Sequence, residues 1–159
     1  MNYNIIKLNE TEKLEEYNPS IILQEDKFLD NKKYILQIKN FNIGFSYYDL
    51  GINYNVLILN KVIYLGFGMS ILICNIDRRE KIYSKTDILQ VVYEILHFQD
   101  ISTVVYICEA KIVCFNEEGK FIREYGFFES IYDYNVGSDR IEILFEESKK
   151  QTIILNDNI

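Results

Sequence analysis

The residues best suited to catalysis or metal binding in this sequence are one histidine and three cysteines. His97 is the single histidine among 159 residues, and the cysteines are Cys74, Cys108 and Cys114. They could form a Cys₃His zinc site, but zinc sites usually take ligands in pairs two to four residues apart. Five residues separate Cys108 from Cys114, and both lie in apolar runs. We therefore expect buried thiols, with no metal and no cofactor.

A catalytic role would have to combine His97 with a thiol or a carboxylate. The sequence has neither a G-x-S-x-G nor an H-E-x-x-H motif. Gly66 and Gly68 follow an apolar run, as in a phosphate-binding loop, but position 71 is Ile and the next residues resemble a strand. A bulge or tight hairpin explains both glycines. We expect no catalytic residue, and a small enzyme using His97 and a Cys is the less favoured alternative.

Negative charge and aromatic residues are concentrated in residues 109–147. This segment has 10 acidic and 4 basic residues, a net charge of −6, and the whole chain has −7. It also contains eight aromatic residues: Phe115, Phe121, Tyr125, Phe127, Phe128, Tyr132, Tyr134 and Phe145. Carboxylates steer a basic partner and aromatic rings anchor it. The alternative is a solvated strand face with half of its aromatic residues in the core.

The predicted partner-binding residues are Glu117, Glu118, Glu124, Glu129, Tyr132, Asp133 and Tyr134. The partner that fits them is a basic protein surface. A nucleic-acid partner is not expected, because binding to phosphates needs a basic patch.

Strands must position these residues, since Ile and Tyr are abundant and Ala is nearly absent. We predict one mainly β domain over residues 1–159, an antiparallel meander or sandwich. Residues 1–30 form a polar lead-in with a short helix capped by Thr11 and ended by Pro19. Residues 34–156 form a β-rich body. The sequence Leu59-Asn60-Lys61-Val62 predicts a two-residue hairpin turn.

Two segments allow more than one interpretation. Residues 86–97 fit one helical face or one strand face, so an α+β fold with a helix at 86–97 is the alternative to a strand there. Residues 62–76 are uncharged, but 15 residues fall short of the ~20 that a membrane helix needs. We expect two buried strands and no membrane partner.

A hairpin pattern recurs along the chain. "VIYLGFGMSILICNIDRREKIYS" and "VVYICEAKIVCFNEEGKFIREY" each contain two apolar runs, a polar turn with Lys and a further run. A similar turn occurs at residues 145–150. Residues 62–125 resemble blade hairpins of quinoprotein-type β-propellers, which implies blade-like hairpins. At ~40 residues a blade, the chain has room for about three, fewer than a closed propeller needs, and no cofactor carries over.

The whole chain is similar in type to small acidic bacterial toxin-immunity proteins. This resemblance implies a non-enzymatic protein that masks a basic toxin surface with residues 109–147. The alternative is a structural or assembly module that pairs through a sheet edge. Three cysteines and an N-terminus without a basic start and apolar run predict a cytoplasmic protein.

Overall fold

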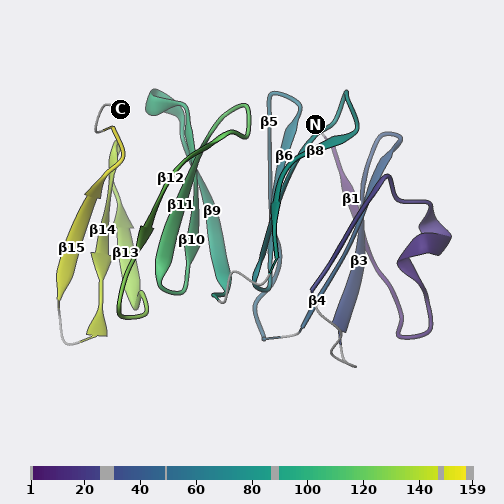
Figure 1. Ribbon diagram of the computed structural model, residues 1–159, viewed down its shortest axis with the longest axis horizontal. Helices are drawn as coiled ribbons and strands as arrows, with labels where there is room; N and C mark the ends of the chain where they lie inside the picture. Colours follow the sequence, from purple (N-terminus) through teal and green to yellow (C-terminus); the bar gives the residue numbers. More distant parts are fainter. Residues whose placement is uncertain (1, 26–30, 49, 87–89, 147–148, 157–159) are drawn as a thin grey trace.

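The computed structural model describes residues 2–25, 31–48, 50–86, 90–146 and 149–156, and it is mainly β. The strands form four sheets that follow one another along the long axis of the molecule (Figure 1). The first sheet, of order β1-β3-β4-β2, contains β1 (Asn4–Lys7), β2 (Ile21–Gln24), β3 (Asn31–Ile38) and β4 (Phe41–Tyr48). All of its pairs are antiparallel except β2 with β4, which is parallel.

The second and third sheets are four-stranded antiparallel meanders. The second has the order β5 (Asn55–Leu59), β6 (Val62–Phe67), β7 (Ser70–Asn75) and β8 (Glu80–Lys85). The third has the order β9 (Val92–Phe98), β10 (Thr103–Cys108), β11 (Lys111–Asn116) and β12 (Phe121–Gly126). The blade-like hairpins expected over residues 62–125 are therefore present as β6–β8 and β10–β12.

The fourth sheet has three strands, β13 (Asp133–Val136), β14 (Arg140–Leu144) and β15 (Lys150–Ile154). The turn expected at residues 145–150 joins β14 to β15, although residues 147 and 148 lie outside the described part of the chain. Among the described residues the fourth sheet thus has one strand fewer than the second and the third.

Three hydrophobic cores lie between successive sheets. Side chains alternate along each strand, so Ile63 and Leu65 of β6 enter the first core, whereas Tyr64 enters the second. In the same way Tyr106 of β10 enters the second core and Val105 enters the third. Because β6, β7, β10 and β11 are covered on both faces, their sequences are nearly continuous apolar runs.

The described outer sides of the first and fourth sheets differ from the cores between the sheets. On the first sheet, Leu8 and Leu14 pack against Ile35. On the fourth sheet, the outward side chains of Glu142 and Lys150 form an ion pair. The described sheets therefore form an open row of four and not a closed ring or a two-layer sandwich.

The N-terminal segment differs from the prediction. In place of a short helix capped by Thr11, the structure has a single 3₁₀ turn, η1 (Leu14–Tyr17), preceded by Lys13 without a side-chain cap. Its Leu14 side chain packs over Gly44 of β4, and this tertiary contact holds the turn. The expected lead-in also contributes β1 and β2 to the first sheet, so β structure begins well before residue 34.

The ambiguous segment is a strand over its described C-terminal part. β9 pairs with β10 from Val92 to Phe98, so a helix at residues 86–97 is wrong for this part; residues 87–89 lie outside the described chain. Pairing with β10 decides the conformation, because periodicity alone fits both. A second 3₁₀ turn, η2 (Gln99–Ile101), follows β9. No helix among the described residues is long and apolar enough to cross a membrane.

The predicted hairpin turn at residues 59–62 is confirmed. Leu59 pairs with Val62, and Asn60 and Lys61 between them both have positive φ, 43° and 71°. Two successive positive φ values are those of a type I′ turn, whose twist matches the strands on either side. The uncharged run at residues 62–76 is the buried β6–β7 hairpin, as expected.

Candidate functional site

The three cysteine thiols lie in three different cores. Cys74 belongs to the first core, Cys108 to the second and Cys114 to the third. Burial raises the pKa of each thiol to about 12, so each is a neutral thiol at physiological pH. No three His, Cys, Asp or Glu residues gather as metal ligands within the described ranges. The thiols act as small core side chains.

His97 contacts a carboxylate and not a thiol. Its Nε2 lies 2.7 Å from Oε1 of Glu117, and both side chains are 22% exposed. Asn60 at the β5–β6 hairpin donates from Nδ2 to the other oxygen, Oε2, at 3.2 Å. The Glu117 carboxylate therefore connects the second sheet to the third. One residue of the expected partner-binding set is engaged within the protein.

The turn that carries Glu117 is fixed by its own sequence. The Asn116 side chain accepts hydrogen bonds from the N–H groups of Glu118 and Lys120 at 3.2 and 2.8 Å. Gly119 has φ +82°, and a Cβ atom there would lie 2.7 Å from Ile73 of the second sheet. The Asn-x-x-Gly pattern thus has a structural cause, because the turn needs a positive φ and a close approach to the neighbouring sheet.

The β6–β7 turn that follows Gly66 and Phe67 binds a carboxylate of the protein itself. Gly68, with φ +46°, lies in the β6–β7 turn. The buried Glu25 carboxylate accepts hydrogen bonds there from the Met69 N–H at 2.5 Å and the Ser70 hydroxyl at 2.8 Å. The tight hairpin expected from the sequence is confirmed, and it anchors the N-terminal segment to the second sheet. Sequence reasoning missed Glu25 because its partners are more than 40 positions away.

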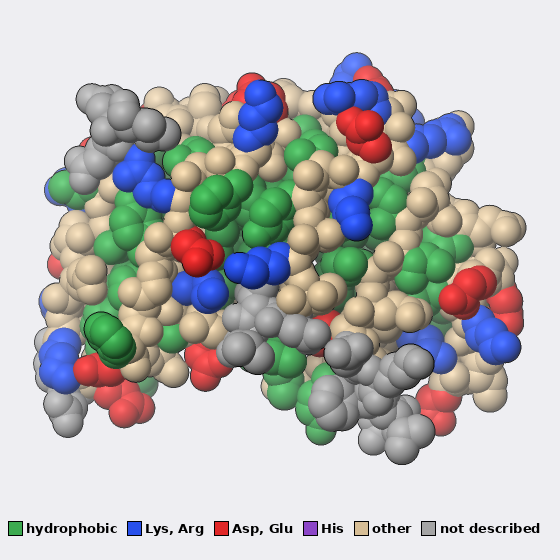
Figure 2. Space-filling view, viewed as in Figure 1, with side chains coloured by type: hydrophobic (Ala, Val, Ile, Leu, Met, Phe, Trp, Pro, Cys, Tyr) green, Lys and Arg blue, Asp and Glu red, His purple; other side chains and the backbone are tan. Residues whose placement is uncertain are grey.

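The seven predicted partner-binding residues do not form one surface. Glu117 points toward the second sheet, and Glu118 is exposed on the same turn. Glu124 lies on β12 opposite Val113, a residue of the second core. Tyr134 donates its hydroxyl hydrogen to Glu94 of β9, and burial raises its pKa. On the face shown in Figure 2, acidic and basic side chains are interspersed.

The remaining three predicted residues share one loop. Glu129, Tyr132 and Asp133 lie in or directly after the segment that joins β12 to β13, and all three are exposed. Phe128 in the same segment is fully exposed, and Tyr132 is 76% exposed. We call residues 127–133 the β12–β13 loop. It holds the two most exposed aromatic side chains of the described chain.

Backbone hydrogen bonds fix the β12–β13 loop in place. The N–H groups of Phe127 and Ile131 donate to the carbonyls of Ala110 and Glu109, at 2.9 and 2.6 Å. The Tyr132 N–H donates to the Leu144 carbonyl at 2.9 Å. The Ile131 side chain is buried in the third core. The exposed rings of the loop therefore project from a backbone that is attached to both the third and the fourth sheets.

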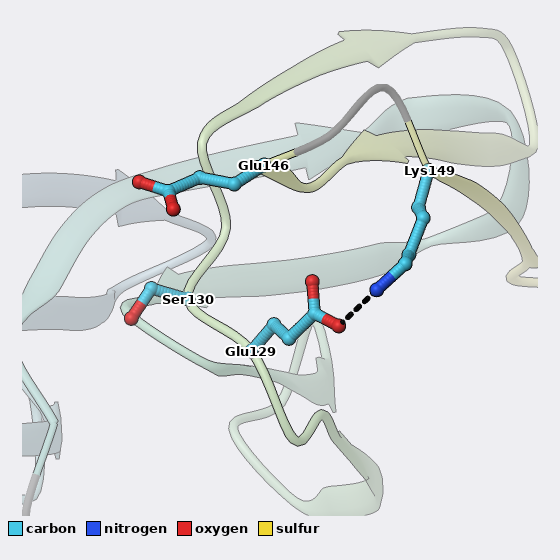
Figure 3. Close-up of a pocket in the computed structure, with 4 residues that line it drawn as sticks. All are labelled: Glu129, Ser130, Glu146 and Lys149. Carbon is cyan, nitrogen blue, oxygen red and sulfur yellow. Dashed lines mark hydrogen bonds and ion pairs between the residues drawn. The ribbon is translucent and has the colours of Figure 1, made fainter.

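A concavity of about 360 Å³ adjoins the β12–β13 loop. Glu129, Ser130, Glu146 and Lys149 line it. Glu129 and Lys149 point toward each other and form an ion pair at 2.8 Å, whereas Glu146 points away from Lys149 (Figure 3). Glu109 lies close by, since the Ser130 hydroxyl is 3.5 Å from its Oε1. The carboxylates of Glu109, Glu129 and Glu146 outnumber the Lys149 ammonium, so these four groups have a net negative charge.

Comparisons with known proteins assign neither a family nor a function to the chain. No protein-family model and no curated protein matches the sequence. Among similar solved structures, BamB from Moraxella catarrhalis has 11% identity and a TM-score of 0.43, over 61% of this chain and 30% of that chain. Hsv2p from Kluyveromyces lactis has 14% identity and a TM-score of 0.45, over 84% of this chain and 50% of that one. The WD40 domain of Neurospora crassa Pan2 has 8% identity and a TM-score of 0.39, over 80% and 46%. The chain thus spans half or less of the length of these structures.

Proposed function

We propose that the chain is a non-enzymatic protein-binding protein, and that the β12–β13 loop captures a basic partner surface. The observation that carries this proposal is the exposure of Phe128 and Tyr132 on a loop whose backbone is fixed. Rings on a fixed backbone lose little conformational freedom when a partner binds, and aromatic anchors dominate the binding energy at interfaces.

The charges around the loop favour a basic partner. Glu129 and Asp133 are exposed on the loop, Glu146 is exposed and lines the adjoining concavity, and Lys149 forms an ion pair with Glu129. A Lys or Arg side chain of a partner could compete with Lys149 for the Glu129 carboxylate. Such exchange has a small net cost, because an exposed ion pair contributes only about 0–1 kcal/mol.

The more specific form of the proposal is an immunity role, in which the loop masks a basic toxin surface. The resemblance in type, the acidic charge and the absence of a catalytic motif support it. In this proposal His97 has a structural role, because its imidazole and Asn60 of the second sheet both contact the Glu117 carboxylate. The alternative role, assembly through a sheet edge, is independent of the loop.

To test the loop as the binding site, we compare two double variants, each of which replaces one Phe by Ala and one Glu by Gln. The loop variant carries Phe128→Ala and Glu129→Gln, and the control carries Phe121→Ala and Glu124→Gln on β12, where both side chains are also exposed. Each protein is immobilised and incubated with an extract of the cells from which the sequence comes, at ~50 and ~300 mM salt. Retained proteins are identified by mass spectrometry.

We expect a basic protein to be retained by the wild type and the control at low salt, and lost from the loop variant and at high salt. If the immunity role holds, expression of this retained protein alone should arrest growth, and co-expression of the wild-type chain should restore it. If the loop variant retains the same proteins as the wild type, the β12–β13 loop is not the binding site. Equal loss from both variants would show that the wider 109–147 face acts, as the sequence alone suggests.

A further inference from the structure

Glu109 is a half-buried carboxylate without a cation beside it in the described chain. Its carboxylate makes hydrogen-bond contact there with one polar group, the Ser130 hydroxyl, at 3.5 Å from Oε1. The other half-buried or buried carboxylates of the described chain each have a basic partner or a closer hydrogen-bond donor: Glu12, Glu25, Glu94, Glu117, Asp139 and Glu142. An anion that loses part of its water without such a partner raises the free energy of the folded chain. Glu109 is therefore suited to receive a cation from another molecule.

The backbone of Glu109 is fixed by hydrogen bonds of both its N–H and its carbonyl group. Glu109 and Ala110 form the two-residue turn between β10 and β11. The Glu109 N–H donates to the Val91 carbonyl at 2.9 Å, and the Glu109 carbonyl accepts from the Ile131 N–H at 2.6 Å. The turn thus connects the residue before β9 to the β12–β13 loop. Because the backbone is held in this way, binding through Glu109 orders only its side chain.

Tyr93 is the exposed aromatic residue near Glu109. The pairing of β9 with β10 shifts between Val92 and Glu94, so Tyr93 is the extra residue of a β-bulge. A bulge changes the direction of a side chain and is frequent next to active sites. The Tyr93 ring is 36% exposed. Burial raises the pKa of Tyr93 and the negative charge of Glu109 raises it further, so the hydroxyl lies within electrostatic range of this carboxylate.

The β12–β13 loop meets Glu109 through Ser130. Figure 3 shows Ser130 and Glu129 pointing in opposite directions, with Glu129 toward Lys149. The Lys149 ammonium therefore neutralises Glu129, and the charge of Glu109 stays available. Because the same loop carries the exposed rings of the proposed interface, Glu109 adjoins that interface.

We propose that Glu109, Tyr93 and Ser130 bind one arginine side chain of the basic partner, and we call these three residues the arginine site. The proposal rests on the proposed function, since the β12–β13 loop supplies the rest of the interface. A guanidinium donates two parallel hydrogen bonds to a carboxylate and stacks on an aromatic ring. It is also less strongly hydrated than a lysine ammonium, so it enters a half-buried position at a lower cost.

The test measures binding of a single arginine to the full chain. The probes are two glycine–serine nonapeptides with blocked ends, one with a central Arg and one with a central Lys. Each is titrated into the ¹⁵N-labelled protein at ~20 mM salt, where charge pairs are weakly screened, and the amide shifts give dissociation constants. The decisive variant is Glu109→Gln, which keeps the side-chain size. The matched control is Glu118→Gln, which removes the same charge from an exposed position on the β11–β12 turn.

We expect the Arg peptide to shift the amide signals of Glu109, Tyr93 and Ser130, and the Lys peptide to bind at least ~3-fold more weakly. Glu109→Gln should weaken binding of the Arg peptide at least ~10-fold, and Glu118→Gln should change it less than about twofold. The thermal midpoint of Glu109→Gln should equal or exceed that of the wild type, because no internal cation loses its partner. Equal binding of the Arg peptide to the wild type and Glu109→Gln, equal binding of the two peptides, or a lower midpoint for Glu109→Gln would overturn the proposal.

The arginine site and the loop are tested separately. Phe128→Ala, which removes a ring of the loop, should bind the Arg peptide within about twofold of the wild type, since this ring is not part of the arginine site. If the Arg peptide binds as expected while the loop variant still retains the proteins of the extract, only the loop proposal fails. If the loop variant loses its partner while Glu109→Gln retains it with wild-type affinity, the loop remains the binding site and the arginine site is wrong.

Discussion

The second and third sheets bury both of their faces, whereas the fourth sheet buries one. In β6 and β10 every residue is buried, and successive side chains enter different cores. In β15 only Ile153 is buried, and its neighbours Thr152 and Ile154 are exposed. The inner sheets have no surface available for a partner except at their edges and turns. Binding by this chain must therefore use the end sheet, an edge or a loop.

The acidic segment of residues 109–147 includes both kinds of sheet, the inner third sheet and the outer fourth sheet. Its first part, through β11, belongs to an inner sheet, and Phe115 there is fully buried between Tyr83 and Tyr106. Its later part contains the β12–β13 loop and the fourth sheet. Aromatic residues that look equivalent in the sequence thus have opposite roles, in packing for Phe115 and in exposure for Phe128.

The largest expected effect is the difference in stability loss between Phe115→Ala and Phe128→Ala. Phe115→Ala removes a ring that lies 4.9 Å from Tyr83 and 5.6 Å from Tyr106, so we expect a loss of about 3–5 kcal/mol in the free energy of unfolding. Phe128→Ala removes a ring in water and should change it by less than ~0.5 kcal/mol. Urea unfolding curves measure both values. A large loss of unfolding free energy for Phe128→Ala would mean that its ring packs against the protein, and the contrast between a buried Phe115 and an exposed Phe128 would be wrong.

A second effect concerns the thiols of the three cores. Their pKa is about 12 in the folded chain, above the value of ~8.5 for an unfolded cysteine. Between these values the unfolded chain releases protons that the folded chain keeps, so stability falls as pH rises. The slope should be about 1.4 kcal/mol per pH unit for each thiol, and no thiol effect should appear below about pH 8.

The variant Cys114→Ala sharpens this test, since it should remove one thiol's share of the alkaline slope. The control is Gln151→Cys, which places a thiol on an exposed position of β15 and should add no slope. Unfolding free energies at pH 7.5, 9.5 and 10.5 give the slopes. Identical slopes for the wild type and Cys114→Ala would contradict the assigned burial of this thiol.

Much of the fold follows from local patterns in the sequence. The turn at Asn60-Lys61 and the paired hairpins of residues 62–125 are set by residue types within a few positions, so they are predictable. The strand at residues 92–98 and the 3₁₀ turn at Leu14–Tyr17 are not, because contacts with β10 and with Gly44 decide them.

The candidate site was predictable only in part, for the same reason. Composition marks residues 109–147 as acidic and aromatic, but it cannot separate Glu129 in the β12–β13 loop from Glu117 in the β11–β12 turn. Glu117 is turned inward by Asn60, 57 positions away, and by His97 on another strand. Because Asn60 and His97 are 57 and 20 positions from Glu117, the sequence around Glu117 does not indicate these contacts.

The smallest effect tests whether Glu117 belongs to the structure or to the interface. Glu117→Gln keeps the side-chain size but removes the charge that pairs with His97 at 2.7 Å, so we expect a loss of about 1 kcal/mol in stability. Binding of a basic partner should change less than about twofold, because the carboxylate already serves the contact between two sheets. Glu129→Gln should show the reverse, with unchanged stability and weaker binding, since its pair with Lys149 is exposed. Urea unfolding and the affinity for the retained partner, measured on both variants, separate the two roles. If Glu117→Gln weakens binding as much as Glu129→Gln does, the interface extends from the loop to the β11–β12 turn, and the division between inner sheets and end sheet does not limit where this chain binds.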